Sequence, residues 1–359
     1  SAQISPPSPP YVYPVTWGPV MSPELQQVWE WRVALAYFLM GIGGMGLVLL
    51  AATDIRFRRK AAEGKPVYNG YRFAQALTAL LSFALAGASL VSAAGKPATA
   101  GFAIYYYGLM NGRWESWMFL GAGFLGISIL LALVYSAIWL GPKLGPLSAA
   151  TKWFFSKSRG ADIASYAFIA LAIAFGVLST FYGGILFSQT NISLWKNSML
   201  PLLFPASGLS AAAAALMILA SLIIKDVGEK ERTIAFLSTV DLFAVASEAV
   251  LLGLYLYIGF VFARAFQSVE ELLFGTWAFY FWLLVVTIGI AIPLLLELAM
   301  HKVNPKHYVW MVPLVFLLVL IGAFSLRYFA VIAAAYYYPP LSPLSPTQMQ
   351  FPFGTRWGP

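Results

Sequence analysis

The sequence contains no cysteine and only two histidines, and this excludes most redox centres that a protein can hold by itself. Without cysteine the chain can form no disulfide, no thiolate zinc site and no cysteine-ligated iron–sulfur cluster. His301 and His307 lie in one polar stretch, which excludes a haem held by two histidines inside a membrane. Any role in electron transfer therefore requires partner subunits that carry the redox centres.

Charged side chains are also scarce. They make up 10% of the chain, hydrophobic residues make up 60%, and the mean hydropathy is +0.77. A soluble domain carries roughly 25% charged residues, so we expect this chain to have the lipid bilayer as its solvent. The net charge of +8 does not indicate nucleic-acid binding, because the basic residues flank apolar stretches, as they do in membrane proteins.

Apolar stretches long enough to cross a bilayer occur eight times. They show no alternation of polar and apolar residues, so they predict helices and not the strands of a barrel. We therefore predict an all-α integral membrane protein with eight transmembrane helices. Their approximate limits are 28–53, 71–94, 114–140, 162–188, 199–224, 233–262, 276–300 and 308–335.

The segments outside these stretches suggest how the chain is organised. Residues 1–16 lack the basic and apolar regions of a secretory signal peptide, so we interpret 1–27 as an extended proline-rich arm. Residues 28–188 and 199–335 would form two four-helix bundles, and 336–359 a tail. The first and fifth helices share a middle rich in small residues, which favours a duplicated unit. Small residues are also common in membrane helices generally, and both interpretations stay open.

The distribution of lysine and arginine predicts the orientation. Fifteen of these residues lie in the connections after the first, third, fifth and seventh helices, and seven lie on the other side together with both termini. Positive residues mark the cytoplasmic side of a membrane protein. We therefore expect both termini to be extracytoplasmic.

A polar cluster is expected at the outer edge of the membrane, surrounded by tryptophans. Because Glu30 and Arg32 are two residues apart, they would point to different faces of a helix and pair with other helices, not with each other. A polar pocket with aromatic walls suits an amphipathic ring with an apolar tail, such as a quinone. The alternative is a belt of interface ion pairs with tryptophan anchors. The candidate quinone-binding residues are Glu30, Arg32, Asn111, Arg113, Glu115 and Trp117.

A second set of polar residues lies deeper in the predicted helices, where charges are costly and often functional. Asp241 and Glu248 are seven residues apart, so they share one helix face, which Tyr255 continues. Arg327 is a candidate counter-charge. These four residues could form a proton path, or they could be structural hydrogen bonds and salt bridges. Three further carboxylates are expected to be solvated or paired at cytoplasmic helix ends, although they could also admit protons: Asp54, Asp162 and Glu297.

The sequence GIGGMG in the first helix superficially matches a dinucleotide-binding fingerprint. It lies in the middle of a predicted span with no preceding strand, so we interpret it as a helix-packing face.

Several stretches, in order, resemble the NrfD/PsrC family of membrane subunits from molybdopterin and iron–sulfur respiratory oxidoreductases. The likeness covers nearly the whole chain. It is carried by VWEWRVALAYFLMGIGGMG, SAAGKPATAGFAIYYYGLMNGRWESWMFLGAG, FYGGILFSQTNISLWKNSMLPLLFPASGLSAAAAAL, FLSTVDLFAVASEAVLLGLYLY and GAFSLRYFAVIAAA.

The resemblance implies a quinone-binding subunit of the plasma membrane that has no haem, iron–sulfur cluster or metal of its own. Its bound substrate would be menaquinone or a similar quinone. It implies a ferredoxin-like iron–sulfur partner and a molybdopterin catalytic subunit on the extracytoplasmic face. It supports Asn111, Glu115 and Trp117 near the quinone and Asp241, Glu248 and Arg327 in the core.

We therefore expect the chain to exchange electrons between the quinone pool and an iron–sulfur partner. The sequence does not decide whether this exchange is coupled to proton translocation. One alternative is a secondary transporter, whose site would lie near mid-bilayer on broken helices. Pro293 and Pro313 offer breaks, but the sequence has no matched pair of interruptions. The other alternative is a passive membrane anchor whose internal charges are structural.

Overall fold

The fold is described from a computed structural model of the protein. It describes residues 29–61, 69–94, 115–143, 145–156, 158–190, 192, 194–261, 263–300 and 312–333, and single residues at 101, 106, 108, 110 and 112. The predicted arm and tail, both histidines, Asn111 and Arg113 lie outside the described residues.

Every regular element in the described part of the chain is helical, as the apolar stretches predict. Most elements are α-helices; η2 is a 3-10 turn and η3 is a π-helix. The elements are α1 (Trp31–Ala61), α2 (Gly70–Ala93), α4 (Trp117–Leu140), η2 (Gly141–Lys143), α5 (Gly145–Phe154), α6 (Arg159–Ser188), α7 (Leu200–Ile223), α8 (Val227–Val261), α9 (Ala263–Leu273), α10 (Ala278–Tyr280), η3 (Phe281–Ala291), α11 (Ile292–Met300) and α12 (Val312–Ile332).

Eight helices in the described residues are long and apolar enough to span a membrane, which confirms the predicted class. The first runs from Trp31 to Ile55 and the sixth from Val227 to Val261. The sixth begins six residues before its predicted limit, because charged residues at its start belong to the helix although they fall outside its apolar part. The others are Gly70–Ala93, Trp117–Lys143, Arg159–Ser188, Leu200–Ile223, Ala278–Met300 and Val312–Ile332.

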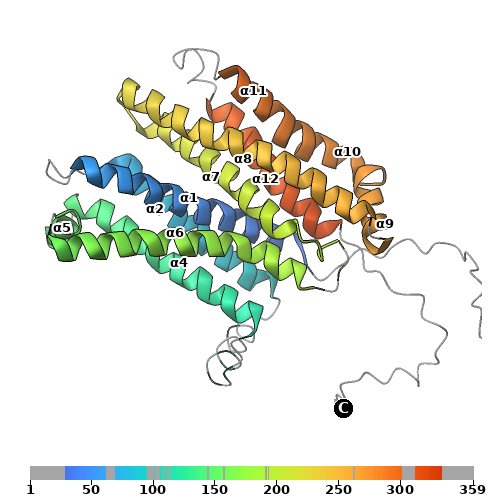
Figure 1. Cartoon of the computed structure of the whole chain (residues 1–359), viewed down its shortest axis with the longest axis horizontal. Helices are drawn as coiled ribbons and strands as arrows, with labels where there is room; N and C mark the ends of the chain where they lie inside the picture. Colours follow the sequence, from blue (N-terminus) through green and yellow to red (C-terminus); the bar gives the residue numbers. More distant parts are fainter. Residues whose placement is uncertain are drawn as a thin grey trace, which may run out of the picture.

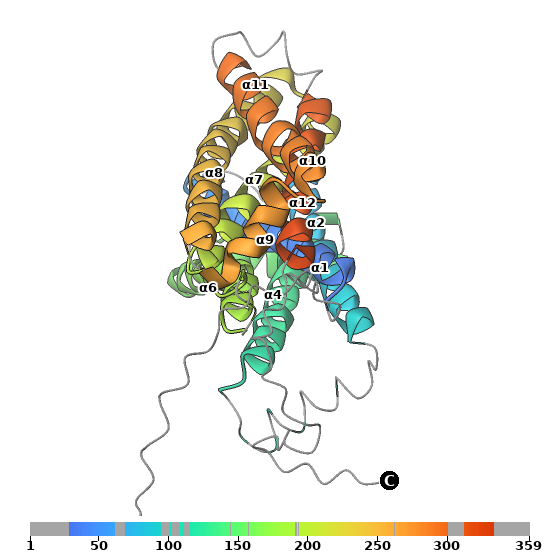
Figure 2. The same ribbon diagram turned by 90° about the vertical axis from the view of Figure 1, so that its right-hand side faces the viewer.

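The helices form two neighbouring groups. In the first, α1 packs on α2 and α6, and α4 packs on α2 and α6; in the second, α7 packs on α8 and α12, and α12 packs on η3. Contacts of α1 with α7 and α12, and of α6 with α7, join the groups. Figures 1 and 2 show α4 and α11 at opposite extremes of the molecule, with α1, α7 and α12 between them.

Glycines in the first helix allow its backbone to approach two neighbours closely, which confirms the packing role of GIGGMG. A Cβ atom on Gly41 would lie 3.1 Å from the Cα atom of Gly208 in α7. A Cβ atom on Gly44 would lie 2.5 Å from the carbonyl oxygen of Gly176 in α6. Small residues at such crossings stabilise membrane helices by close van der Waals contact.

This crossing predicts a position-specific loss of stability. Gly44→Ala should destabilise the chain by about 2 kcal/mol, because the new methyl group must push α1 away from the α6 backbone. Gly46→Ala is the matched control, since it makes the same change in the same helix where no atom lies within 4 Å. Thermal unfolding in detergent should show a lower Tm for the first variant only. Equal Tm values for both variants would contradict the close crossing.

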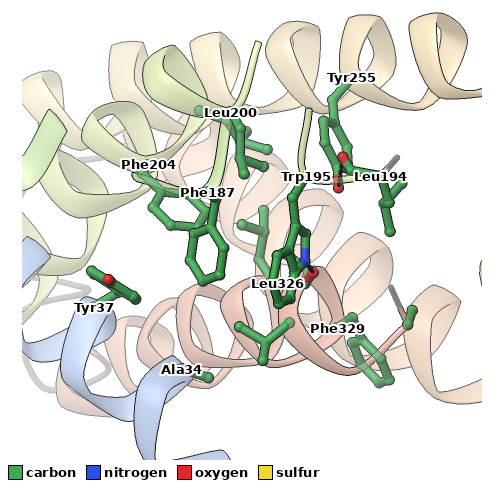
Figure 3. Packing of buried hydrophobic residues seen from close by; sticks show 14 of the residues in the cluster. Ala34, Tyr37, Phe187, Leu194, Trp195, Leu200, Phe204, Tyr255, Leu326 and Phe329 are labelled. Carbon is green, nitrogen blue, oxygen red and sulfur yellow. Dashed lines mark hydrogen bonds between the residues drawn. The ribbon is translucent and has the colours of Figure 1, made fainter. Parts of the chain in front are cut away.

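An aromatic core closes one end of the bundle around the connection between α6 and α7. Trp195 is buried, its Nε1 donates to the carbonyl oxygen of Ala330 at 2.6 Å, and its ring contacts Phe187 at 4.7 Å between centroids. Figure 3 shows Trp195 between Phe187 and the α12 residues Leu326 and Phe329. We call this end, which holds Trp29, Trp31, Trp117 and Trp195, the tryptophan end. The opposite end, which holds Arg72, Arg159 and Arg232, is the basic end.

Candidate functional site

Glu30 and Arg32 pair with each other at the tryptophan end, which corrects the prediction that they would not. The Nε atom of Arg32 lies 3.7 Å from Oε2 of Glu30, with side chains 42% and 57% exposed respectively. The prediction assumed that both residues are helical. Because α1 begins at Trp31, Glu30 precedes the helix, and helical geometry does not set the direction of its side chain. Arg32 also bonds another helix, as expected, through Nη1 and the carbonyl oxygen of Ser92 at 3.1 Å.

Exposed tryptophans accompany this ion pair. Trp31 is 50% exposed, and the guanidinium carbon of Arg32 lies 6.0 Å from the centroid of its ring. Trp117 begins α4 and is 37% exposed. Glu115 is exposed in the turn before α4 and makes no hydrogen bond or ion pair with another described residue. The described contacts therefore bring together Glu30, Arg32 and Trp31, and they do not link this group to Glu115 or Trp117.

Arg327 lies in the last third of α12, where this helix meets the first two turns of α7. It is 1% exposed, and its guanidinium donates to Ser207 Oγ at 2.9 Å, to the carbonyl oxygen of Phe204 at 3.0 Å and to that of Ala323 at 2.8 Å. It also lies 5.4 Å from the ring centroid of Phe204. Gly41 leaves room for it, because a Cβ atom there would lie 2.9 Å from Nη2.

Glu248 faces the same junction from α8. It is 4% exposed, interacts with the Ser207 hydroxyl and lies close enough to Arg327 for their charges to interact. The three side chains come from α7, α8 and α12, so a hydroxyl, a carboxyl and a guanidinium gather inside the bundle where these helices meet.

Asp241 and Glu297 form a second buried group closer to the basic end. Both are 0% exposed, and the Asp241 carboxyl neighbours that of Glu297 as well as the hydroxyl of Ser210. The Asp241 oxygens make no hydrogen bond of standard geometry with the described residues. Two adjacent carboxyl groups away from water would have to share or exchange protons, because both cannot be charged at low cost.

The burial of Glu297 differs from the prediction of a solvated or ion-paired carboxylate at a helix end. It lies in α11, which directly follows the π-helical segment Phe281–Ala291. A π-helix bonds residues five apart, so it changes which face of the following helix points inward.

Asp54 behaves as expected of a paired group: it is 1% exposed, and its Oδ1 lies 3.0 Å from Nη1 of Arg72. Asp162 lies partly exposed in the first turn of α6.

Tyr255 continues the buried face of α8 but contacts the closing connection. Its hydroxyl donates to the carbonyl oxygen of Leu194 at 3.3 Å, and its own carbonyl accepts from Asn197 Nδ2 at 2.9 Å. Leu252 is the buried residue between Tyr255 and Glu248 on this face. Tyr255 therefore fixes α8 to the tryptophan end. Neither Asn197 nor Trp195 is among the predicted site residues. A tryptophan and an asparagine in the short connection between α6 and α7 could have suggested that this connection packs on neighbouring helices.

The proline positions do not produce matched helix breaks in the described spans. Pro313 is the second residue of α12, where a proline lacks no intrahelical bond, and Pro293 follows the π-helical segment. Pro205 lies inside α7, which continues through it.

Comparison with known proteins gives matches along nearly the whole sequence. A family model described as "Polysulphide reductase, NrfD" matches residues 19–339, which include all eight spans. A polysulfide reductase subunit of Wolinella succinogenes is 28% identical over 312 residues, covering 85% of the sequence described here and 94% of that protein.

Two further relatives agree. The NrfD homolog of Haemophilus influenzae is 26% identical over 330 residues, covering 89% of this chain and 97% of that protein. Protein NrfD of Escherichia coli is 26% identical over 297 residues, covering 75% of this chain and 84% of that protein. The family match and the eight helices together indicate a multi-pass membrane subunit, and the chain belongs to the NrfD family of polysulphide reductase proteins.

Proposed function

We propose that this chain is the quinone-binding membrane subunit of a respiratory oxidoreductase. It would exchange electrons between the quinone pool and an iron–sulfur partner. The family match over residues 19–339 carries the proposal, and the relative in Wolinella succinogenes is by name one subunit of a polysulfide reductase. The absence of cysteine fits this role, because electrons would leave through a partner's centres.

Several side chains at the tryptophan end are suited to binding a quinone ring. Arg32 offers guanidinium donors that can bind a ring carbonyl, and Glu30 beside it can exchange a proton. Trp31 and Trp117 expose apolar ring surface at the depth where amphipathic rings collect in a bilayer. Glu115 is exposed near the start of α4 and would be a second proton acceptor. Asn111 and Arg113 complete the proposed set on the basis of the family resemblance.

The reaction at this site must balance protons and electrons. Oxidation of a quinol releases two electrons and two protons, and reduction of a quinone consumes the same. The electrons would pass singly to or from the partner's nearest iron–sulfur cluster. The protons would pass through Glu30 or Glu115 to the water beside the membrane, so carboxylates exposed at this end are suited to the task.

The buried polar groups provide a route for protons in the core. Asp241, Glu297, Glu248 and Arg327 follow one another from the basic half of the bundle toward the tryptophan end, and such residues inside a membrane commonly serve proton relays. In this proposal they would couple quinone chemistry to proton movement, with Tyr255 beyond them. The same groups also join four helices, which is the structural role that a passive anchor would give them.

The proposed partners follow from the same family. A ferredoxin-like iron–sulfur subunit would cover the tryptophan end, and a molybdopterin subunit would bind that partner. The excess of lysine and arginine in the four connections of the basic end supports a cytoplasmic position for this end by the positive-inside rule. The partners would then stand on the extracytoplasmic face of the plasma membrane.

The test compares the assembled complex with the same partner subunits purified without this chain. The complete complex should reduce or oxidise a quinone and also a soluble dye, whereas the partners alone should use only the dye. Quinone activity without this chain would contradict the proposal. Uptake of a solute into vesicles containing only this chain would favour a transporter instead.

A further inference from the structure

A cavity opens between the two helix groups at the basic end, away from the proposed quinone site. Its volume is about 390 Å³, and α1, α2 and α8 provide its walls. Tyr71 ties α2 to the helix behind it, because its hydroxyl donates to the carbonyl oxygen of Leu216 in α7 at 3.1 Å. This hydrogen bond ties α2, which forms one wall of the cavity, to the second helix group.

The lining changes from polar to apolar with depth. Arg72, Glu229 and Arg232 lie within the first two turns of α2 and α8, at the membrane edge of these helices. Phe236 and Leu237 lie one to two turns further into α8, and Leu49 lies further into α1. This gradient matches a lipid that enters with its head group at the membrane edge and its acyl chains in the core.

Two opposite charges on α8 face the cavity without pairing with each other. Glu229 and Arg232 are three residues apart, which puts them on the same helix face. The Arg232 guanidinium bonds only the carbonyl oxygen of Gly228, from Nε at 3.1 Å, among the described residues. The Glu229 carboxylate has no ion pair in the described part of the chain. An anion and a cation held side by side are complementary to a molecule that carries both charges.

The other arginine of the cavity is already neutralised. Arg72 pairs with Asp54 at 3.0 Å and also donates to Thr53 Oγ1. Its guanidinium is 6.0 Å from the ring centroid of Trp139, so it is held from a third side as well. The charge of Arg72 is therefore compensated by Asp54, which does not itself line the cavity, and Arg232 is the main site for an anionic group.

We propose that this cavity binds a phospholipid with an aminoethyl-phosphate head group, that is, a phosphatidylethanolamine. The phosphate would lie against Arg232, the ammonium against Glu229, and the acyl chains along Leu49, Phe236 and Leu237. A lipid with only a negative head group would leave Glu229 beside an anion. This site is independent of the proposed electron transfer at the other end.

Native mass spectrometry of the purified complex, titrated with phosphatidylethanolamine or phosphatidylglycerol, tests the proposal. The unmodified complex should bind one phosphatidylethanolamine about tenfold more tightly than phosphatidylglycerol, as expected from one additional charge-assisted contact. Arg232→Gln should weaken the binding of both lipids about tenfold, because both carry the phosphate. Glu229→Gln should weaken phosphatidylethanolamine alone and abolish the preference.

Two matched variants control for charge. Lys225→Gln removes a positive charge near the same end from an exposed residue outside the cavity, and Glu270→Gln removes a negative charge from an exposed side chain of α9, also outside the cavity. Neither should change lipid binding. An unchanged preference in Glu229→Gln, or displacement of the lipid by millimolar inorganic phosphate or by a quinone analogue, would overturn the proposal.

Discussion

Glu115→Gln is expected to slow quinone turnover by the assembled complex about a hundredfold, the usual size of a lost general acid–base contribution. The carboxylate is exposed before α4 and has no described partner, so it is available to exchange protons with a quinone ring. Glutamine keeps the size and polarity of the side chain but cannot carry the proton. The measurement is the steady-state rate with a short-chain quinone as substrate.

The same preparations should keep their full rate with a soluble dye that accepts electrons from the partner subunits. Glu270→Gln is the matched control, because Glu270 is another exposed carboxylate, in the helix that follows α8. It should leave both rates unchanged. Equal loss of quinone and dye activity in Glu115→Gln would refute the assigned role and indicate a damaged assembly.

Arg327→Met is expected to destabilise the chain by about 3 kcal/mol, because it leaves the buried groups around this side chain without hydrogen-bond partners and without a nearby positive charge. The substitution removes three hydrogen bonds to α7 and α12 and leaves Glu248 buried without its counter-charge. Thermal unfolding of the detergent-solubilised chain should show a lower Tm and a reduced yield of folded protein.

A second substitution separates the charge from the packing. Adding Glu248→Gln to Arg327→Met should recover part of the lost stability, because it removes the buried charge that the first change left unpaired. Arg32→Met provides the control at an exposed ion pair, where little change in Tm is expected. No recovery in the double variant would show that Glu248 and Arg327 do not interact as charges.

The helices could be predicted from the sequence because a bilayer imposes a simple length rule. All eight spans follow from apolar stretches near 20 residues, and the position of GIGGMG within one of them predicts its role as a packing face. The shared face of Asp241 and Glu248 also follows from helical spacing, and both are buried. Each of these inferences needs only the regular geometry of one helix.

The features that could not be predicted depend on irregular backbone or on contacts between distant segments. Glu30 can pair with Arg32 because α1 begins at Trp31, one residue after Glu30. The predicted span began at residue 28, which placed both residues in the helix and their side chains on different faces. Glu297 is buried in the helix that follows a π-helical segment. This segment changes which side of the following helix faces inward, and no sequence pattern predicts it reliably. The closing contacts of Trp195 and Asn197 join residues 135 and 58 positions apart, which local patterns cannot reveal.

We propose a quinone site at the tryptophan end, beneath an iron–sulfur partner. Photoaffinity labelling of the native complex with an azido-quinone, followed by peptide mapping, tests this most directly. We expect labels on the peptides around Glu30–Arg32 and Glu115–Trp117. Labels confined to the cavity around Arg72 and Arg232, or no specific labelling in a complex that still turns over quinone, would contradict the claim.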